Sequence, residues 1–322
     1  MMNQKIKPMT ESGVLSAITV VMALVGVYVP ILGTVAALIW PLPMVVLIVR
    51  HGLRWGVMAV AVAAVLMAIL LEPLLSLRMV VAFAPVGIAL GLGYRKGFSA
   101  GKLLCVTIAV SIVAKVAVIL LVMFVTNINP FAMQLDTMKE AFNGSLDMYR
   151  GLNMSEAQLA EAETNFSATL EILSMLFPLI VIIMGLFDAY VNFWVAGKVL
   201  RKLGHSGLPQ LAPFSEWHLS SLFLYLYGFG LVGMYWGGTR QIQWLYQLSF
   251  NANLLASFFG LIQGLALLQY MGNHWKLSKF MRWVLVLFVL LNGTFAQILA
   301  FTGLFDMVFD YRRRFSSKNN GN

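Results

Sequence analysis

The stretch Leu103–Val125, LLCVTIAVSIVAKVAVILLVMFV, is apolar almost throughout and carries a single charged residue, Lys115. As an α-helix it would be about 34 Å long, which is enough to cross the ~30 Å hydrocarbon core of a bilayer. An ionisable side chain at that depth costs at least ~2.5–3.5 kcal/mol on insertion scales. Such a residue therefore indicates a partner or a water-filled cavity inside the membrane.

Apolar runs of this kind recur along the whole chain. The sequence is 60% hydrophobic and 11% charged, whereas a soluble domain has ~25% charged residues. The runs do not alternate as barrel strands do. We therefore predict an all-α, polytopic transmembrane helical bundle with about nine membrane segments and eight to nine crossings. The expected segments are Val14–Val29, Thr34–Val49, Trp55–Leu71, Met79–Tyr94, Leu103–Val125, Leu176–Val195, Leu219–Trp236, Leu245–Met271 and Trp283–Phe305.

The net charge of +9 arises mostly from short loops between apolar runs. This pattern indicates membrane orientation by the positive-inside rule, and we expect no nucleic-acid partner. With Lys5 and Lys7 on the cytoplasmic side, the first six segments obey the rule. The last segment breaks it, because a full crossing by Trp283–Phe305 would place the arginines from Arg312 onward outside. A break at Asn292–Gly293 that makes a shallow hairpin is one alternative, and the side of the C-terminus stays open.

The longest polar stretch, Thr126–Glu171, contains seven acidic and two basic residues. Helically spaced apolar residues within it predict an amphipathic helix. Ser155 and Gln158 have the spacing of a capping box and predict the start of a second helix that runs into the sixth segment. This stretch would either gate a site on the outer face or lie flat at the membrane interface.

The sixth apolar run carries one acid, Asp188. Counted from the basic residues at their inner ends, Lys115 lies about 20 Å deep and Asp188 about 15 Å deep. Consecutive antiparallel helices tend to be neighbours, so we predict that the two side chains pair, with Asn192 one turn from Asp188. The pair is either a substrate or ion site at mid-membrane depth or a structural ion pair that fixes helix register.

The sequence shows no catalytic or metal-binding pattern. Cys105 is the only cysteine, and the four histidines form no HExxH motif. A phosphate-binding loop is also missing, so the chain cannot drive ATP-dependent transport by itself. We expect a protein that is not an enzyme, with no cofactor and no metal. Gly13 and Ala17 form a small-xxx-small face suited to close helix packing.

Both ends of the chain resemble the YybS-like family of bacterial predicted membrane proteins. The resemblance rests on TESGVLSA at 10–17, Pro30, WPLP at 40–43 and RHG at 50–52, then on Gln263-Gly264 and GLFDMVFDYRR at 303–313. In the last motif, Asp306, Asp310, Arg312 and Arg313 are its charged residues. The resemblance implies a membrane protein of the bacterial cytoplasmic membrane and does not specify an activity.

The first six segments are also remotely similar to S components, the substrate-binding subunits of energy-coupling factor transporters. That similarity implies a six-helix fold with both termini in the cytoplasm and a vitamin or metal-ion site near the outer face. It also implies docking of the first helix on a transmembrane coupling subunit that works with ATPases. Gly13 and Ala17 stand where the S components have a small-residue face, and the three extra segments depart from the pattern.

These observations lead to a domain plan and two candidate functions. We expect an S-component-like membrane domain at 1–205 with the outer amphipathic loop at 126–171, a three-segment membrane extension at 206–311 and a basic polar tail at 312–322. The chain would be the small-molecule-binding component of a transport system, with the lipid bilayer, a coupling subunit and ATPases as partners. The alternative is a non-catalytic membrane scaffold in envelope assembly or sporulation.

Overall fold

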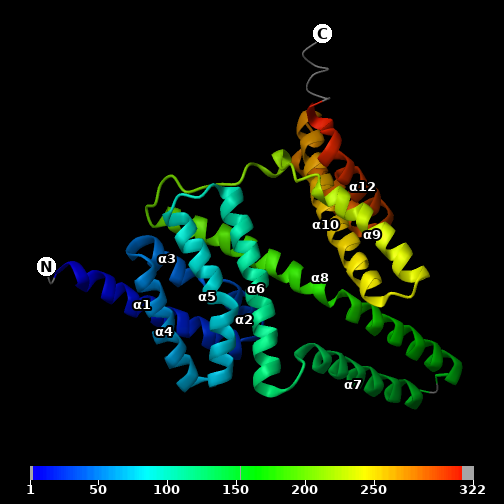
Figure 1. Ribbon diagram of the computed structural model, residues 1–322, viewed down its shortest axis with the longest axis horizontal. Coiled ribbons are helices and arrows are strands. Elements are labelled where there is room, and N and C mark those ends of the chain that lie inside the picture. Colours follow the sequence, from blue (N-terminus) through cyan, green and yellow to red (C-terminus); the bar gives the residue numbers. More distant parts are fainter. Residues whose placement is uncertain (1–2, 153, 314–322) are drawn as a thin grey trace, which may run out of the picture. The chain divides into compact units, whose positions relative to one another are not determined.

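The computed structural model describes residues 3–152 and 154–313, and all regular structure in these residues is helical (Figure 1). The predicted basic tail therefore lies almost entirely outside the described residues. The helices are α1 (Asn3–Tyr28), α2 (Pro30–Leu38), α3 (Leu42–His51), α4 (Leu53–Leu70), α5 (Pro73–Arg95), α6 (Ala100–Thr126), α7 (Pro130–Gly151), α8 (Glu156–Lys202), the 3-10 turn η1 (Phe214–Glu216), α9 (Leu222–Thr239), α10 (Gln243–His274), α11 (Lys279–Leu291) and α12 (Gly293–Phe309).

Seven of the described spans are long and apolar enough to cross a membrane, and the bent pair α11–α12 would add an eighth. The polytopic helical membrane fold predicted from the apolar runs is confirmed. The seventh predicted segment forms α9, but α9 is not among these spans. Its glycines and tyrosines lower the mean hydropathy of an otherwise apolar helix.

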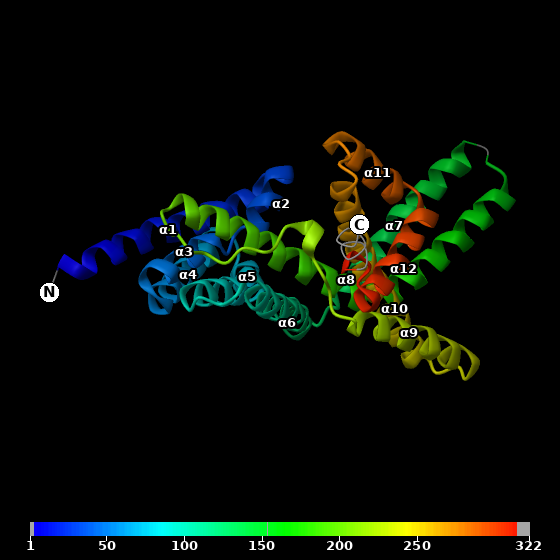
Figure 2. The same cartoon turned by 90° about the horizontal axis from the view of Figure 1, so that it is seen from above.

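The chain divides into two compact units, one made of 1–170 and 180–211 and the other of 171–179 and 212–322. The 47-residue helix α8 contributes to both. The first unit holds α1 to α7 and two stretches of α8, and α5 and α6 lie side by side in it (Figure 2). These two units are defined by the packing of residues alone. The domain limits expected from the sequence stay a prediction.

The short helix α3 lies at the centre of the first unit. Its residues from Pro43 to Ile48 are all buried. Met44 and Ile48 pack in a cluster with residues of α1, α4 and α5, whereas Val45 and Val46 pack in a second cluster with α5, α6 and α8. Both faces of α3 are therefore covered, as expected for an apolar helix without a polar side.

The second predicted segment, Thr34–Val49, lies within Pro30–His51, one span that is long and apolar enough to cross a membrane but consists of two helices. The chain breaks at Ile39–Pro41, between α2 and α3. Pro41 caps α3 and Pro43 follows in its first turn. Proline has no backbone N–H, so it fits the first turn of a new helix and disrupts a continuing one.

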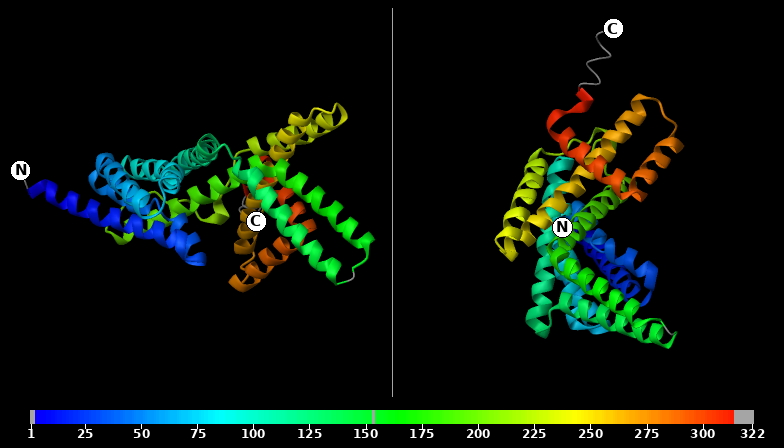
Figure 3. Two further views of the ribbon diagram at one scale, coloured as in Figure 1. Left: turned by 90° about the horizontal axis from the view of Figure 1, so that it is seen from below. Right: turned by 90° about the vertical axis from the view of Figure 1, so that its right-hand side faces the viewer.

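The polar stretch Thr126–Glu171 forms two antiparallel helices, α7 and the first part of α8 (Figure 3). The predicted capping box at Ser155 and Gln158 is present. The rings of Phe142 and Phe166 stack 3.9 Å apart between the two helices. The amphipathic helix is confirmed, whereas its role as a gate stays a prediction.

In the second unit, α9 and α12 both lie along α10 (Figure 1). Facing glycines allow α12 to pack closely on α10, because a Cβ atom on Gly303 would collide with the backbone of Gly260 and Gly264 on α10. Such Gly-xxx-Gly faces let membrane helices approach backbone to backbone.

The last predicted segment is bent by 106° between α11 and α12, as the right panel of Figure 3 shows. The Asn292 side chain accepts hydrogen bonds from the N–H groups of Thr294 and Phe295. It thereby caps α12 and fixes the break at the position considered from the sequence.

Candidate functional site

The Lys115 Nζ atom lies 3.0 Å from Oδ2 of Asp188, within the first unit. The two side chains are 15% and 4% exposed, respectively. Their pairing agrees with the prediction that two lone charges on consecutive apolar runs would meet. A buried charge without a partner is far more costly than a paired one, which explains why both are present.

Two further polar side chains complete the environment of Asp188. Ser111 Oγ donates a hydrogen bond to Oδ2 at 2.9 Å, and Asn192 Nδ2 donates to Oδ1 at 2.9 Å. Ser111 precedes Lys115 by one turn of α6, and Asn192 follows Asp188 by one turn of α8. Residues at i and i+4 share one helix face, so each helix presents two polar groups to the other.

Asn192 also connects this cluster to the break between α2 and α3. Its Nδ2 atom donates to the carbonyl oxygen of Leu38 at 2.9 Å. Leu38 is the last residue of α2, where carbonyl groups have no partner within the helix. The buried amide of Asn192 therefore satisfies both a carboxylate and a free helix end.

One aromatic residue lies against the ion pair, and a second lies against the first. The Lys115 ammonium lies 4.3 Å from the ring centroid of Phe83, and the Phe83 and Trp40 ring centroids lie 6.1 Å apart. Trp40 is in the break itself and is 1% exposed. Its indole Nε1 has no hydrogen-bond partner among the described residues, although a buried indole N–H usually has one.

Sequence reasoning found Lys115, Asp188 and Asn192 and missed Ser111, Phe83 and Trp40. The position of Ser111, four residues before Lys115, was a usable signal because the two share a helix face. Phe83 and Trp40 are apolar residues in apolar runs, so only the fold distinguishes them.

A second buried network lies in the other unit and includes part of the C-terminal motif. Asp306 is fully buried, and its carboxylate accepts a hydrogen bond from Gln263 Nε2 at 2.6 Å. Arg312 Nη2 lies 3.6 Å from the same carboxylate, and Arg312 Nη1 donates to the Ser215 carbonyl at 2.8 Å. These residues join α10, α12 and the chain around η1, which fits a structural role.

The remaining predicted residues are at the surface of their helices. Asp310 is the left-handed cap of α12, with φ 44°, and Arg313 is exposed. Gly13 and Ala17 are both exposed on α1, and a Cβ atom on Gly13 would meet nothing within 4 Å. Among the described residues, no group of three or more His, Cys, Asp and Glu side chains could hold a metal ion.

Comparison with known proteins gives the family. The model of the family described as "Predicted membrane protein (DUF2232)" matches residues 17–307. The chain is also 23% identical to the "Uncharacterized protein YybS" of Bacillus subtilis (strain 168) over 314 residues, which is 96% of this chain and 98% of that protein. No solved structure matches the chain. The chain belongs to the DUF2232 family of predicted membrane proteins, as its YybS-like terminal motifs suggested.

Proposed function

We propose that the chain is the solute-binding component of a membrane transport system, and that Lys115, Asp188 and Asn192 form its binding site. One observation carries the proposal: a buried ion pair lies against a break in an apolar span. Asn192 bonds both Asp188 and the last carbonyl of α2. Broken helices at membrane depth are tolerated where they line a cavity or a site, and transporters place their substrate sites at such breaks.

The chemistry of the cluster suits a small solute with a charged or strongly polar group. A carboxylate on the solute would accept hydrogen bonds from Lys115, and an amine or a cation would be held by Asp188. A solute that carries both an anionic and a cationic group would pair with Lys115 and Asp188 at once, so that every buried charge stays compensated, which is the condition for charge inside a membrane.

Transport would require partner proteins, since the sequence carries no nucleotide-binding motif. We propose a coupling subunit with ATPases, docked on the exposed face of Gly13 and Ala17. The chain would lie in the bacterial cytoplasmic membrane with its N-terminus in the cytoplasm, and it would not be an enzyme.

The alternative is a non-catalytic scaffold in envelope assembly or sporulation, in which the pair only fixes helix register. It is favoured by the hydrogen bonds of Asp188, whose two oxygens both have partners within the same unit. In that case the cluster would have no solute to exchange.

Small molecules retained by the purified full-length protein separate the two functions. We expect wild-type protein to retain a polar solute, identified by mass spectrometry after denaturation. The double variant K115M/D188L should lose it while staying folded, because it replaces the pair with apolar residues. The matched control E11Q/R50Q removes the pair between Glu11 and Arg50 at 3.1 Å and should retain the solute. Lipid alone in all three preparations would contradict the proposal.

A further inference from the structure

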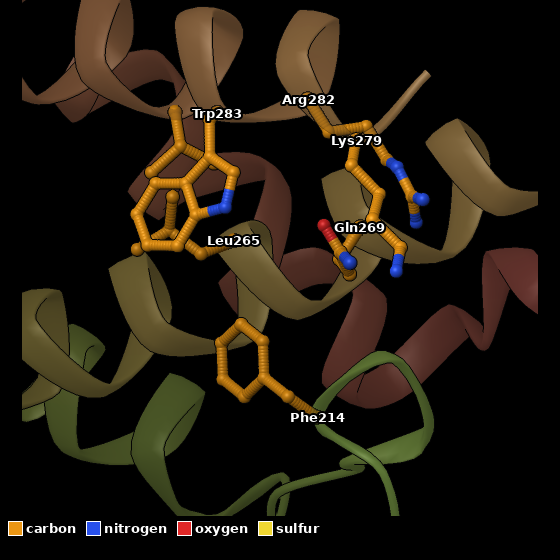
Figure 4. Close-up of a pocket in the computed structure, with 7 residues that line it drawn as sticks. Phe214, Leu265, Gln269, Lys279, Arg282 and Trp283 are labelled. Atoms are coloured by element: carbon orange, nitrogen blue, oxygen red, sulfur yellow. The ribbon is translucent and has the colours of Figure 1, made fainter. Parts of the chain in front are cut away.

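A pocket of about 390 Å³ lies in the second unit between α10, α11 and the chain at Phe214. Figure 4 shows its two different sides. Gln269, Lys279 and Arg282 gather on one side, whereas Trp283, Leu265 and Phe214 form the other. The pocket therefore combines a cationic, hydrogen-bonding end with an apolar end.

The cations of this pocket have no acidic partner. Between Glu216 and Asp306 the sequence contains no Asp or Glu. Among the described residues, no ion pair includes Lys279 or Arg282. Arg282 donates through Nη1 to Asn273 Oδ1, while its buried Nε has no hydrogen-bond partner in the described chain. Two positive charges thus face the pocket uncompensated.

The stem of Arg282 lies against the backbone of α10. A Cβ atom on Gly272 would lie 2.8 Å from Cδ of Arg282, so the side chain packs directly on the backbone of α10. This packing places the guanidinium at the cationic end of the pocket.

The helix that carries these cations exposes its apolar side chains. α11 has no buried residue, and Phe280 and Leu291 are 78% and 79% exposed. Lys279 and Arg282 lie in its first turns. Apolar side chains that follow basic ones along a helix are typical of segments that enter a bilayer from its headgroup region. The apolar end of the pocket would then be continuous with acyl chains.

We propose that this pocket binds the headgroup and upper acyl chain of an anionic phospholipid. The phosphate would accept hydrogen bonds from Lys279, Arg282 and Gln269, and the acyl chain would lie along Leu265 and Trp283. Basic pockets between membrane helices are suited to anionic headgroups. We assign a lipid to the pocket and not free phosphate, because a free anion would leave the apolar half of the pocket unfilled.

Native mass spectrometry of the full-length protein with equal amounts of phosphatidylglycerol and phosphatidylcholine of the same chains tests the proposal. We expect wild-type protein to bind phosphatidylglycerol preferentially. The variant K279Q/R282Q should lose about five-fold in affinity for each cation removed, or about twenty-five-fold in total. The control K276Q/R240Q removes the same charge from residues that do not line the pocket and should keep the preference.

Two further variants distinguish lipid binding in the pocket from a general effect of positive charge and from misfolding. L265W keeps every cation and fills the apolar end, so it should also lose phosphatidylglycerol. K279Q alone breaks no hydrogen bond of the described structure and tests the site if the double variant does not fold. Equal binding of both lipids, equal losses in K279Q/R282Q and K276Q/R240Q, or displacement of the lipid by excess inorganic phosphate would overturn the assignment.

Discussion

Gly185 of α8 lies directly against Ile112 of α6. A Cβ atom at position 185 would lie 2.6 Å from Cγ1 of Ile112 and 3.1 Å from its backbone nitrogen. Asp188 follows Gly185 within one turn, and Ser111 is the neighbour of Ile112. The close approach of the two helices therefore sets the distance over which Asp188 meets its partners on α6.

Substitution of Gly185 by valine should separate α6 from α8 and destabilise the protein by about 1–3 kcal/mol, because the added carbons have no space. The free energy of unfolding, measured by titration with a denaturing detergent, checks this. Gly101→Ala on α6 is the control, since a Cβ atom there would meet nothing within 4 Å. Wild-type stability of G185V would show that the helices do not touch at this point.

Removal of one partner of the buried ion pair should cost more than removal of both. D188L leaves the Lys115 ammonium uncompensated and should destabilise by about 3–5 kcal/mol. K115M/D188L leaves no buried charge and should cost less, about 1–3 kcal/mol, because Ser111 and Asn192 still lose their acceptor. A double-mutant cycle of K115M, D188L and K115M/D188L on the free energy of unfolding measures the difference, and additive single costs would show that the pair contributes no coupling.

The parts of the fold that the sequence predicts are those that the bilayer dictates. A span must be long and apolar, so runs such as Leu103–Val125 mark their helices closely. The same constraint makes a lone charge conspicuous, which is why Lys115 and Asp188 could be paired from the sequence. Ligand binding by Lys115, Asp188 and Asn192 and docking at Gly13 and Ala17 stay predictions.

The features that the sequence did not predict depend on contacts between distant residues. Gln263 and Asp306 are 43 residues apart in the chain, and Arg312 lies beyond the last apolar run, so nothing local links them. The break at Ile39–Pro41 lies inside a run that is apolar on both sides. Pro41 and Pro43 at this break are equally compatible with a kinked but continuous helix, because Pro85 lies inside α5 without ending it.

Asn251 bonds the backbone of α8 on both sides of Pro178 in the second unit. Its Nδ2 donates to the Met175 carbonyl at 2.8 Å, and its Oδ1 accepts from the N–H of Leu179 at 3.1 Å. N251L should remove the partner of the Leu179 N–H, at a cost of about 1–3 kcal/mol, whereas Gln247 Nε2 still donates to the Met175 carbonyl at 3.4 Å. N251L should also speed hydrogen exchange at the Leu179 amide.

The matched control for this prediction is Q297L, which removes an amide from an exposed position of α12. It should change neither the free energy of unfolding nor the exchange rate at Leu179. Slow exchange at Leu179 in N251L would show that α8 closes its own hydrogen bond there.

The two arginines of the C-terminal motif should differ in their effect on stability. Arg312 is 9% exposed and bonds the Ser215 carbonyl beside the buried carboxylate of Asp306. R312Q leaves that carboxylate without its countercharge and should cost about 3–5 kcal/mol. R313Q, at the exposed neighbouring position, should cost at most ~1 kcal/mol, because interactions of exposed charges contribute little. Similar unfolding free energies for the two variants would contradict a structural role for Arg312.

The small-residue face of α1 gives a test of the proposed coupling partners. G13L and A17L together add bulk to a surface that the described chain leaves open, so they should not alter the stability of the isolated protein. If a coupling subunit packs on this face, both side chains would prevent close helix approach. Tagged protein extracted from native membranes should then lose its co-purifying ATPases.

The pair V14L and I18L controls for substitutions on α1 in general. It has the same spacing on an adjacent face, where the wild-type residues are 57% and 42% exposed, and it should keep the ATPases. Absence of an ATPase from the wild-type preparation, or its retention by G13L/A17L, would remove the docking proposal. Because Lys115 and Asp188 are unchanged in these variants, retained solute binding in G13L/A17L would separate loss of coupling from loss of the site.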